Sequence, residues 1–235
     1  CDLLLTTNRY NRRYLLTTYP DISPGKIRVY SHGVDLELMQ PTPEPAYPPF
    51  VIASVGRMTW QKGFPTLLKA IRRLLDRGLE IRLDFLAMPG PLSKSTVQLA
   101  RDLKLNRHIH WLSPRPPNKV KEIYQNAHAF ALPCEIGPYG DRDGIPNVIL
   151  EASACGIPCV TTGVSGIPEA VIHGKTGILI APRDENALAD ALQALCENAP
   201  YRRRLGAAAR QYMEQNYDRK TCQAHLAGLM KAVYG

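Results

Sequence analysis

Long apolar runs and paired cysteines are both missing from this sequence of 235 residues. No stretch approaches the roughly 18 consecutive apolar residues that a membrane-spanning helix needs. The six cysteines include no CxxC pair, which argues against a zinc site and against a small secreted module held by disulfides. We therefore expect a folded, soluble protein of a reducing cytoplasm, with its cysteines buried as small apolar side chains.

The first residues lack the features of a translation start or a targeting signal. The sequence begins with Cys1 instead of methionine, and CDLLLTTNRYN has neither the basic lead nor the small-residue cleavage site of a signal peptide. We expect the chain to be part of a longer polypeptide.

Two common phosphate-binding motifs are absent as well. The tripeptide Gly174-Lys175-Thr176 is not a P-loop, because that motif requires a glycine where this chain has Glu169. No GxGxxG pattern follows the first strand expected in the main domain, and the chain has no clear DxD or histidine-cluster metal site. An anion must be bound by other means, and we expect no metal ligands and no cofactor.

The charge of the chain is unbalanced towards the positive. Lysine and arginine number 29 against 21 aspartates and glutamates, a formal net charge of +8, which favours an anionic partner such as a nucleotide phosphate or an acidic membrane. Arginines at 70–78 and 201–211 alternate with apolar residues at helical spacing, which indicates solvated helix faces. No nucleic-acid-binding signature appears, so we expect no nucleic-acid partner.

Short apolar stretches alternate with amphipathic ones from residue 50 onward, the pattern of a parallel sheet with crossover helices. We expect a doubly wound, Rossmann-like α/β domain whose ligand lies beyond the carboxyl ends of the strands. The expected strands are 51–55, 81–86, 109–112, 129–132, 158–161 and 177–180. The expected helices are 64–77, 94–103, 118–126, 147–154, 167–173, 186–194, 202–215 and 219–232.

A proline-rich segment divides the chain. Residues 2–35 read as strand, helix and strand, and residues 38–50 then hold five prolines with no hydrophobic period, which indicates a linker. We expect 1–40 to be the incomplete end of a preceding domain, 41–49 the linker, 50–215 the main domain, and 216–235 a C-terminal helix that crosses a surface.

Two cations follow the expected strand 51–55, in the stretch GRMTWQKGF. Arg57 stands at the end of the strand and Lys62 just before the next helix. A guanidinium, an ammonium and the partial positive charge of a helix N-terminus meet there, which suits a diphosphate. The alternative is a pair of exposed loop cations.

Two acids, Asp143 and Glu151, lie on either side of an expected helix start. Pro146 suits the first helical position and Ile145 is pushed away from helical angles, so the helix should begin at 146–147. Free N–H groups at 144–148 can then face an anion, and the acids can bind hydroxyls on either side of it, as a nucleotide sugar would require. The alternative makes Asp143 a helix cap and Glu151 a solvated helix residue.

Four segments occur in a fixed order on this βα background. They are Gly56-Arg57 with Lys62-Gly63, the acid pair, EASACGIPCVTT at 151–162, and SGIPEAVIHGKTGIL at 165–179. Together they closely resemble the nucleotide-sugar half of the family-four retaining glycosyltransferases, also called glycosyl transferases group 1. The stretch SHGVD at 31–35 resembles the turn before that family's interdomain linker, so the resemblance covers nearly the whole chain.

The resemblance implies roles for the matching residues. Arg57 and Lys62 match the catalytic cations that hold the donor diphosphate, and Glu151 matches the acid that binds the ribose hydroxyls. Asp143, also counted as catalytic, replaces a glutamate that contacts the donor sugar, so its reach is shorter by one methylene. The other residues implied in nucleotide-sugar binding are Gly56, Pro89, Gly90, Ser113, Pro114, Gly144, Ile145, Pro146, Asn147 and Val148.

The resemblance also implies the GT-B fold, in which two Rossmann-like domains face each other across a cleft. The implied reaction is transfer of a sugar, with retention, from a UDP-, GDP- or ADP-sugar to a glycan or lipid-linked acceptor in bacterial surface polysaccharide synthesis. The acceptor would be reached through a missing N-terminal domain, so we expect this chain alone to be inactive. Peripheral contact with the inner face of the plasma membrane is a further expectation, and a non-catalytic nucleotide- or carbohydrate-binding domain is the alternative.

Overall fold

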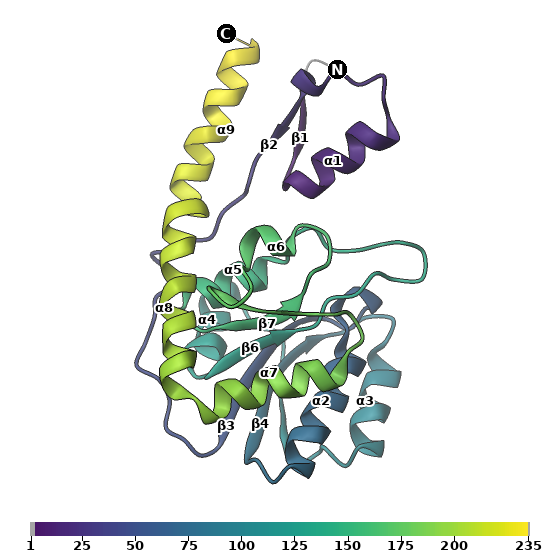
Figure 1. The fold of residues 1–235 in the computed structure, drawn as a ribbon, viewed down its shortest axis with the longest axis vertical. Coiled ribbons are helices and arrows are strands. Elements are labelled where there is room, and N and C mark those ends of the chain that lie inside the picture. The colour runs from purple at the N-terminus through teal and green to yellow at the C-terminus, as the bar shows by residue number, and fades with distance from the viewer. Residues whose placement is uncertain (1–2, 235) are drawn as a thin grey trace.

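The chain is built around a six-stranded parallel sheet with the strand order β5-β4-β3-β6-β7-β8 (Figure 1). The computed structural model describes residues 3–234. The strands are β3 (Phe50–Arg57), β4 (Ile81–Met88), β5 (Ile109–Trp111), β6 (Ala129–Leu132), β7 (Cys159–Thr162) and β8 (Gly177–Ile180). All six expected strands are present, which confirms the doubly wound class. The strand order reverses between β3 and β6, and ligands of such sheets bind outside the carboxyl ends of the strands at this point.

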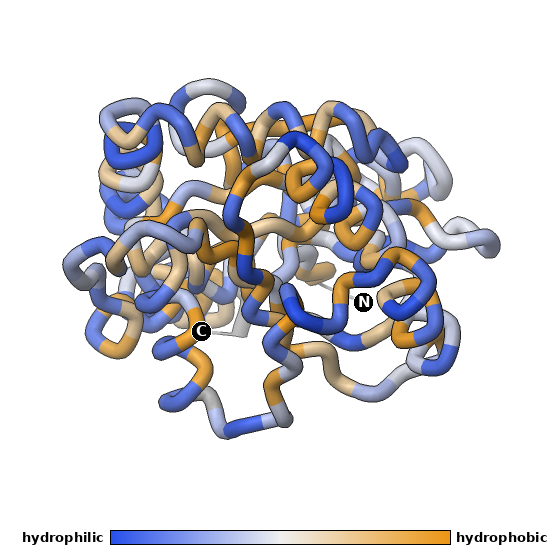
Figure 2. Tube along the Cα trace, turned by 90° about the horizontal axis from the view of Figure 1, so that it is seen from below, coloured by the Kyte–Doolittle hydropathy of each residue, from blue (hydrophilic) through white to orange (hydrophobic). Residues whose placement is uncertain are grey.

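Helices cover both faces of this sheet. Those of the six-stranded part are α2 (Phe64–Asp76), α3 (Ser93–Asp102), α4 (Pro117–Gln125), α5 (Asn147–Ala154), α6 (Ile167–Ala170), α7 (Glu185–Glu197) and α8 (Ala199–Asn216). Helices α2, α3 and α7 pack on one face, and α4 and α5 pack on the other, against α8. The strands between them are nearly all apolar, and Figure 2 shows these apolar stretches, in orange, gathered in the interior.

The central strand explains why the core forms where it does. In β3, FVIASVGR, seven of eight residues are buried and only the terminal Arg57 is exposed. A strand buried on both faces reads as a continuous apolar run, as expected for a parallel sheet. The polar end of the run therefore coincides with the carboxyl edge of the sheet.

Three helices differ from the sequence-based expectation by three residues at one end, and α7 ends at Glu197 instead of 194. The helix expected at 167–173 is a single turn, Ile167–Ala170, because Val171 adopts extended angles and the chain turns at Gly174 towards β8. Helix α8 begins at Ala199 instead of 202, since the Asn198 side chain caps it by accepting a hydrogen bond from the Tyr201 N–H. The extended backbone at Val171 decides the end of α6, and side-chain capping decides the start of α8.

The N-terminal residues form a separate two-stranded parallel sheet. Its strands are β1 (Leu4–Thr6) and β2 (Ile27–Val29), and α1 (Arg9–Thr18) lies between them in the chain. The expected strand, helix and strand are therefore all present. Helix α9 (Arg219–Tyr234) continues from α8 and runs beside β2, away from the six-stranded part (Figure 1). The Arg219 N–H bonds the Val34 carbonyl at 3.0 Å where the two segments meet. None of the described helices combines the length and apolar character needed to cross a bilayer.

Candidate functional site

Lys62 and Asp143 meet at the carboxyl edge of the sheet. The Lys62 Nζ lies 2.9 Å from the Asp143 Oδ2, and the two side chains are 16% and 28% exposed. Lys62 ends a short 3₁₀ helix, Trp60–Lys62, and Gly63 then turns the chain into α2 with a φ of +61°. A Cβ at Gly63 would lie 1.8 Å from the Pro133 carbonyl oxygen, so only glycine lets this turn approach the loop that carries Asp143.

Arg57 is the exposed cation of the site. It ends β3, and no described side chain forms a hydrogen bond or an ion pair with its guanidinium. The loop after β4 packs beside it, since a Cβ at Gly90 would lie 2.4 Å from the Met58 carbonyl oxygen and 3.0 Å from the Arg57 Cγ. The predicted residues Pro89 and Gly90 therefore lie next to Arg57.

The start of α5 is as predicted. Pro146 has extended angles and α5 begins at Asn147. Asp143 does not cap this helix, because no described side chain caps it and the Asp143 carboxylate pairs with Lys62. Asp143 is therefore not a hydrogen-bonded cap of α5, and it lies in the loop before the helix as expected.

Glu151 lies one turn inside α5 and is half-buried, so it is not a solvated helix residue. Its Oε2 accepts a hydrogen bond from the Tyr124 hydroxyl at 2.7 Å. Burial raises the pKa of this carboxyl, and the hydrogen bond from Tyr124 acts in the opposite direction. Glu151 is thus a desolvated acid at the edge of the candidate site.

The remaining predicted residues divide into two groups. Gly56 lies beneath Lys62, since a Cβ there would be 3.4 Å from the Lys62 Cδ. Ser113 and Pro114 follow β5 at the same edge of the sheet but form no contact with the cations or the acids in the described structure. Their place in the site stays a prediction.

The N-terminal piece contacts the same loops, and the sequence patterns did not indicate this. A Cβ at Gly144 or at Gly166 would lie 2.8 Å from the Asn8 side chain. The Glu169 carboxylate accepts the N–H groups of Arg9 at 3.0 Å and Tyr10 at 2.9 Å, the first residues of α1. Glu169 belongs to the segment 165–179 that carries the family resemblance, but the sequence pattern does not show that it contacts α1.

Two further contacts connect this piece with α5 and its preceding loop. The Arg142 guanidinium lies over the rings of Tyr10 and Tyr14, at 5.3 Å and 5.6 Å from the ring centroids. The His32 Nε2 contacts the Asn147 Oδ1. The loop that carries Asp143 is therefore held between the six-stranded part and α1.

Ser165 is a strained residue next to these contacts. Its φ is +55°, in the left-handed region that non-glycine residues seldom adopt, and its buried Oγ has no hydrogen-bond partner in the described structure. Strained backbone and orphaned polar atoms concentrate at functional sites. Ser165 therefore extends the candidate site towards α6.

The five cysteines within residues 3–234 are all buried and form no disulfide. Burial raises the pKa of Cys134, Cys155 and Cys159 to about 12, so these thiols stay protonated at neutral pH. Within residues 3–234, no group of three His, Cys, Asp or Glu side chains is placed to hold a metal ion.

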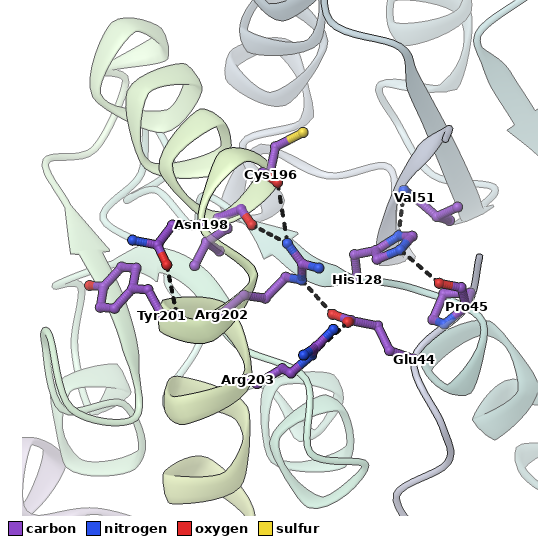
Figure 3. Close-up of polar contacts among 10 residues, drawn as sticks. Glu44, Pro45, Val51, His128, Cys196, Asn198, Tyr201, Arg202 and Arg203 are labelled. Atoms are coloured by element: carbon purple, nitrogen blue, oxygen red, sulfur yellow. Dashed lines mark hydrogen bonds and ion pairs between the residues drawn. The ribbon is translucent and has the colours of Figure 1, made fainter. Parts of the chain in front are cut away.

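A second polar cluster lies at the opposite, amino end of the sheet, where the proline-rich segment crosses α8 (Figure 3). Arg202 is 5 % exposed and donates to the Glu44 carboxylate and to the carbonyls of Leu195 and Cys196. Arg203 donates to the other Glu44 oxygen at 3.0 Å. These contacts fasten the segment to the six-stranded part.

His128 completes this cluster. Its Nδ1 accepts the Val51 N–H at 2.9 Å, and its Nε2 lies 3.1 Å from the Pro45 carbonyl oxygen (Figure 3). This pattern requires the neutral ring with the proton on Nε2. Burial lowers the pKa of His128, and the neighbouring Arg202 charge adds to that effect.

The chain belongs to the family of glycosyl transferases group 1, whose family model matches residues 39–212. The curated relative “Putative colanic acid biosynthesis glycosyltransferase WcaL” of Escherichia coli is 35% identical over 214 residues, which cover 88% of this chain and 52% of WcaL. The chain spans about half the length of the curated relatives it matches.

Solved structures share the fold. A sucrose-phosphate synthase from Thermosynechococcus elongatus superposes with a TM-score of 0.85 and 22% identity, over 100% of this chain and 59% of that one. Anabaena Alr3699/HepE, in complex with UDP and glucose, superposes with a TM-score of 0.84 and 18% identity, over 99% of this chain and 64% of that one. These likenesses show the Rossmann-like fold.

Proposed function

We propose that this chain is the donor-binding part of a glycosyltransferase that moves a sugar from a nucleoside diphosphate sugar to a glycan or lipid-linked acceptor. The observation that carries the proposal is the contact between Lys62 and Asp143 beside Arg57, at the point where the strand order reverses. A diphosphate bound by the two cations would place its sugar near Asp143. The WcaL relative supports a role in bacterial surface polysaccharide synthesis.

Each part of the site has a role in this proposal. Negative charge grows on the departing diphosphate as the sugar leaves, so Arg57 and Lys62 stabilise the transition state more than the bound donor. The acceptor attacks the same face of the sugar, assisted by the leaving group, which gives retention. Asp143 accepts hydrogen bonds from the donor-sugar hydroxyls, and Glu151 accepts hydrogen bonds from the ribose hydroxyls. The two cations and the α5 N-terminus supply the positive charge, so we propose that no metal or cofactor takes part.

The backbone around these side chains completes the donor site in this proposal. The loop and first turn at 144–148 face the diphosphate, and the segments at Pro89-Gly90 and Ser113-Pro114 line the base. Residues 50–215 form the nucleotide-sugar domain and 41–49 the linker. Residues 1–40 belong to the end of the acceptor-side domain, and residues 216–235 form the C-terminal crossing helix.

The expected place of action is the cytoplasm, at the inner face of the plasma membrane where a lipid-linked acceptor would lie. We expect this chain alone to bind nucleotide without transferring sugar. A non-catalytic binding domain remains the second candidate, and detection of transfer by the full-length protein would exclude it.

The test distinguishes binding of the sugar from binding of the nucleotide by comparing ligands with and without the sugar. UDP and UDP-glucose, with their GDP and ADP counterparts, are titrated into the wild type, Asp143→Asn and Glu151→Gln by calorimetry. Glu151→Gln should weaken both kinds of ligand, since both contain ribose. Asp143→Asn should weaken only the nucleotide sugar, by about tenfold for one charge-assisted hydrogen bond.

The same titrations contain their control. EDTA should leave every dissociation constant unchanged. Equal losses for both variants on both ligands would contradict the two roles, and a wild type that binds none of these nucleotides would refute the proposed function.

A further inference from the structure

The environment of Glu151 contains one direct hydrogen-bond donor, and it comes from another helix. The hydroxyl of Tyr124, near the end of α4, donates a hydrogen bond to the Glu151 Oε2 at 2.7 Å. Among the described residues, no other group hydrogen-bonds this carboxylate, so its Oε1 has no protein partner. One oxygen of the acid is therefore occupied and the other is available to a ligand.

The position of the Tyr124 hydroxyl is fixed by the core. The side chain is fully buried, and its ring meets the Phe130 ring of β6 edge-on, with the centroids 5.7 Å apart. A buried phenol cannot exchange its partner for water, and a tyrosine has few rotamers into which it could move. The core of the domain therefore determines which way the Glu151 carboxylate points.

Two opposing effects act on the same acid. Burial raises the pKa of Glu151, while the hydrogen bond from Tyr124 favours the ionised form. A carboxylate that accepts hydrogen bonds from ligand hydroxyls has to be ionised, because a protonated acid loses one acceptor position. The tyrosine thus acts on both the direction and the charge of the group.

We propose that Tyr124 is a positioning residue of the nucleotide site, which holds one oxygen of Glu151 so that the other faces the ribose hydroxyls. This inference rests on the proposed function, since it takes the ribose as the partner of Glu151. Tyr124 itself does not touch the ligand. It determines how strongly the site distinguishes a ribose from a sugar without hydroxyls.

The test compares Tyr124→Phe with the wild type on two ligands, UDP and 2′,3′-dideoxy-UDP. The substitution keeps the ring in the core and removes only the hydroxyl. By calorimetry at pH 7.5, Tyr124→Phe should bind UDP at least fivefold more weakly. Both proteins should bind 2′,3′-dideoxy-UDP with affinities within twofold of each other, because that ligand has no ribose hydroxyl to donate a hydrogen bond to Glu151. An equal loss for both ligands, or no loss for UDP, would overturn the proposal.

A second variant keeps the test decisive if Tyr124→Phe folds poorly. In a Glu151→Gln background no buried charge remains to be stabilised, so adding Tyr124→Phe should change UDP affinity less than twofold. A further fivefold loss in the double variant would overturn the proposal. A wild type that binds neither UDP nor its dideoxy analogue would instead refute the proposed function, and a wild type that binds both equally would refute the ribose role of Glu151.

The pH profile gives a readout that a purely structural tyrosine would not move. Cys155, which follows α5, interacts electrostatically with Glu151 and also with Lys121 on α4, Cys159 on β7 and Arg210 on α8. None of these groups hydrogen-bonds the Glu151 carboxylate in the described structure. UDP affinity should fall on acidification as Glu151 takes up a proton. In Tyr124→Phe the midpoint of that fall should lie at a higher pH, by about half a unit or more. Superimposable profiles would overturn the proposal.

Discussion

The two ends of the six-stranded sheet both carry charge, but they satisfy it differently. At the amino end, Glu44 lies between two arginines, and Arg202 also donates to two carbonyls. At the carboxyl end, Arg57 has no partner among the described side chains and Lys62 has a single one. The polar groups at the amino end complete the fold, whereas those at the carboxyl end leave bonding capacity for a ligand.

The largest expected effect tests the amino end. Arg202→Leu should lower the free energy of unfolding by about 3 kcal/mol, because it removes the hydrogen bonds to two buried carbonyls and leaves Glu44 with one exposed partner. Urea denaturation measures this difference.

The matched control is Arg203→Ala, which removes the exposed arginine from the same glutamate. Its side chain is 67% exposed, so the loss should stay below about 1 kcal/mol. A loss below 1 kcal/mol for Arg202→Leu would remove the difference between the two arginines.

The carboxyl end should show the opposite balance. Lys62→Ala should weaken UDP binding about tenfold, since one charge-assisted contact is lost. Its free energy of unfolding should change by about 1 kcal/mol or less, because the pair with Asp143 is partly exposed to water. Lys175→Ala, at an exposed lysine outside the site, should alter neither quantity. Equal UDP affinity for the two variants would contradict a role of Lys62 in binding the diphosphate.

The smallest effect concerns pH at the amino end. Folding lowers the pKa of His128, so below about pH 6.5, its pKa in the unfolded chain, the unfolded chain binds more protons than the folded one. The contribution of His128 to stability is therefore fully present only above that pH. The stability should therefore fall between pH 7.5 and pH 5.5, a range above the titration of Glu44. His128→Phe should flatten this slope. An unchanged slope would mean that His128 does not contribute the pH dependence.

Much of the fold could be predicted because the signals are local. The unbroken apolar run at 50–56 indicates a doubly covered strand, and Pro146 indicates the start of α5. The helix expected at 167–173 is too long, because the pattern could not show that Val171 leaves helical angles to let the chain reach β8.

The sequence could indicate where the residues of the candidate site lie along the chain, but it could not indicate which of them contact each other. Lys62 and Asp143 are separated by 81 residues, and their contact depends on how closely Gly63 approaches Pro133. Glu169 reaches the N-terminus of α1 across 160 residues. Single-sequence patterns report neighbours along the chain, so contacts of this kind require the three-dimensional structure.

The ion pair at the carboxyl end has a consequence for which anions can enter. A ligand with a single negative charge that takes Lys62 replaces one anion by another and leaves Asp143 without its counterion. A ligand with two phosphoryl groups gains a second contact at Arg57, and an attached sugar hydroxyl can then donate to the released carboxylate. In the proposed donor site, the pair would therefore favour ligands with two phosphoryl groups over anions with a single charge.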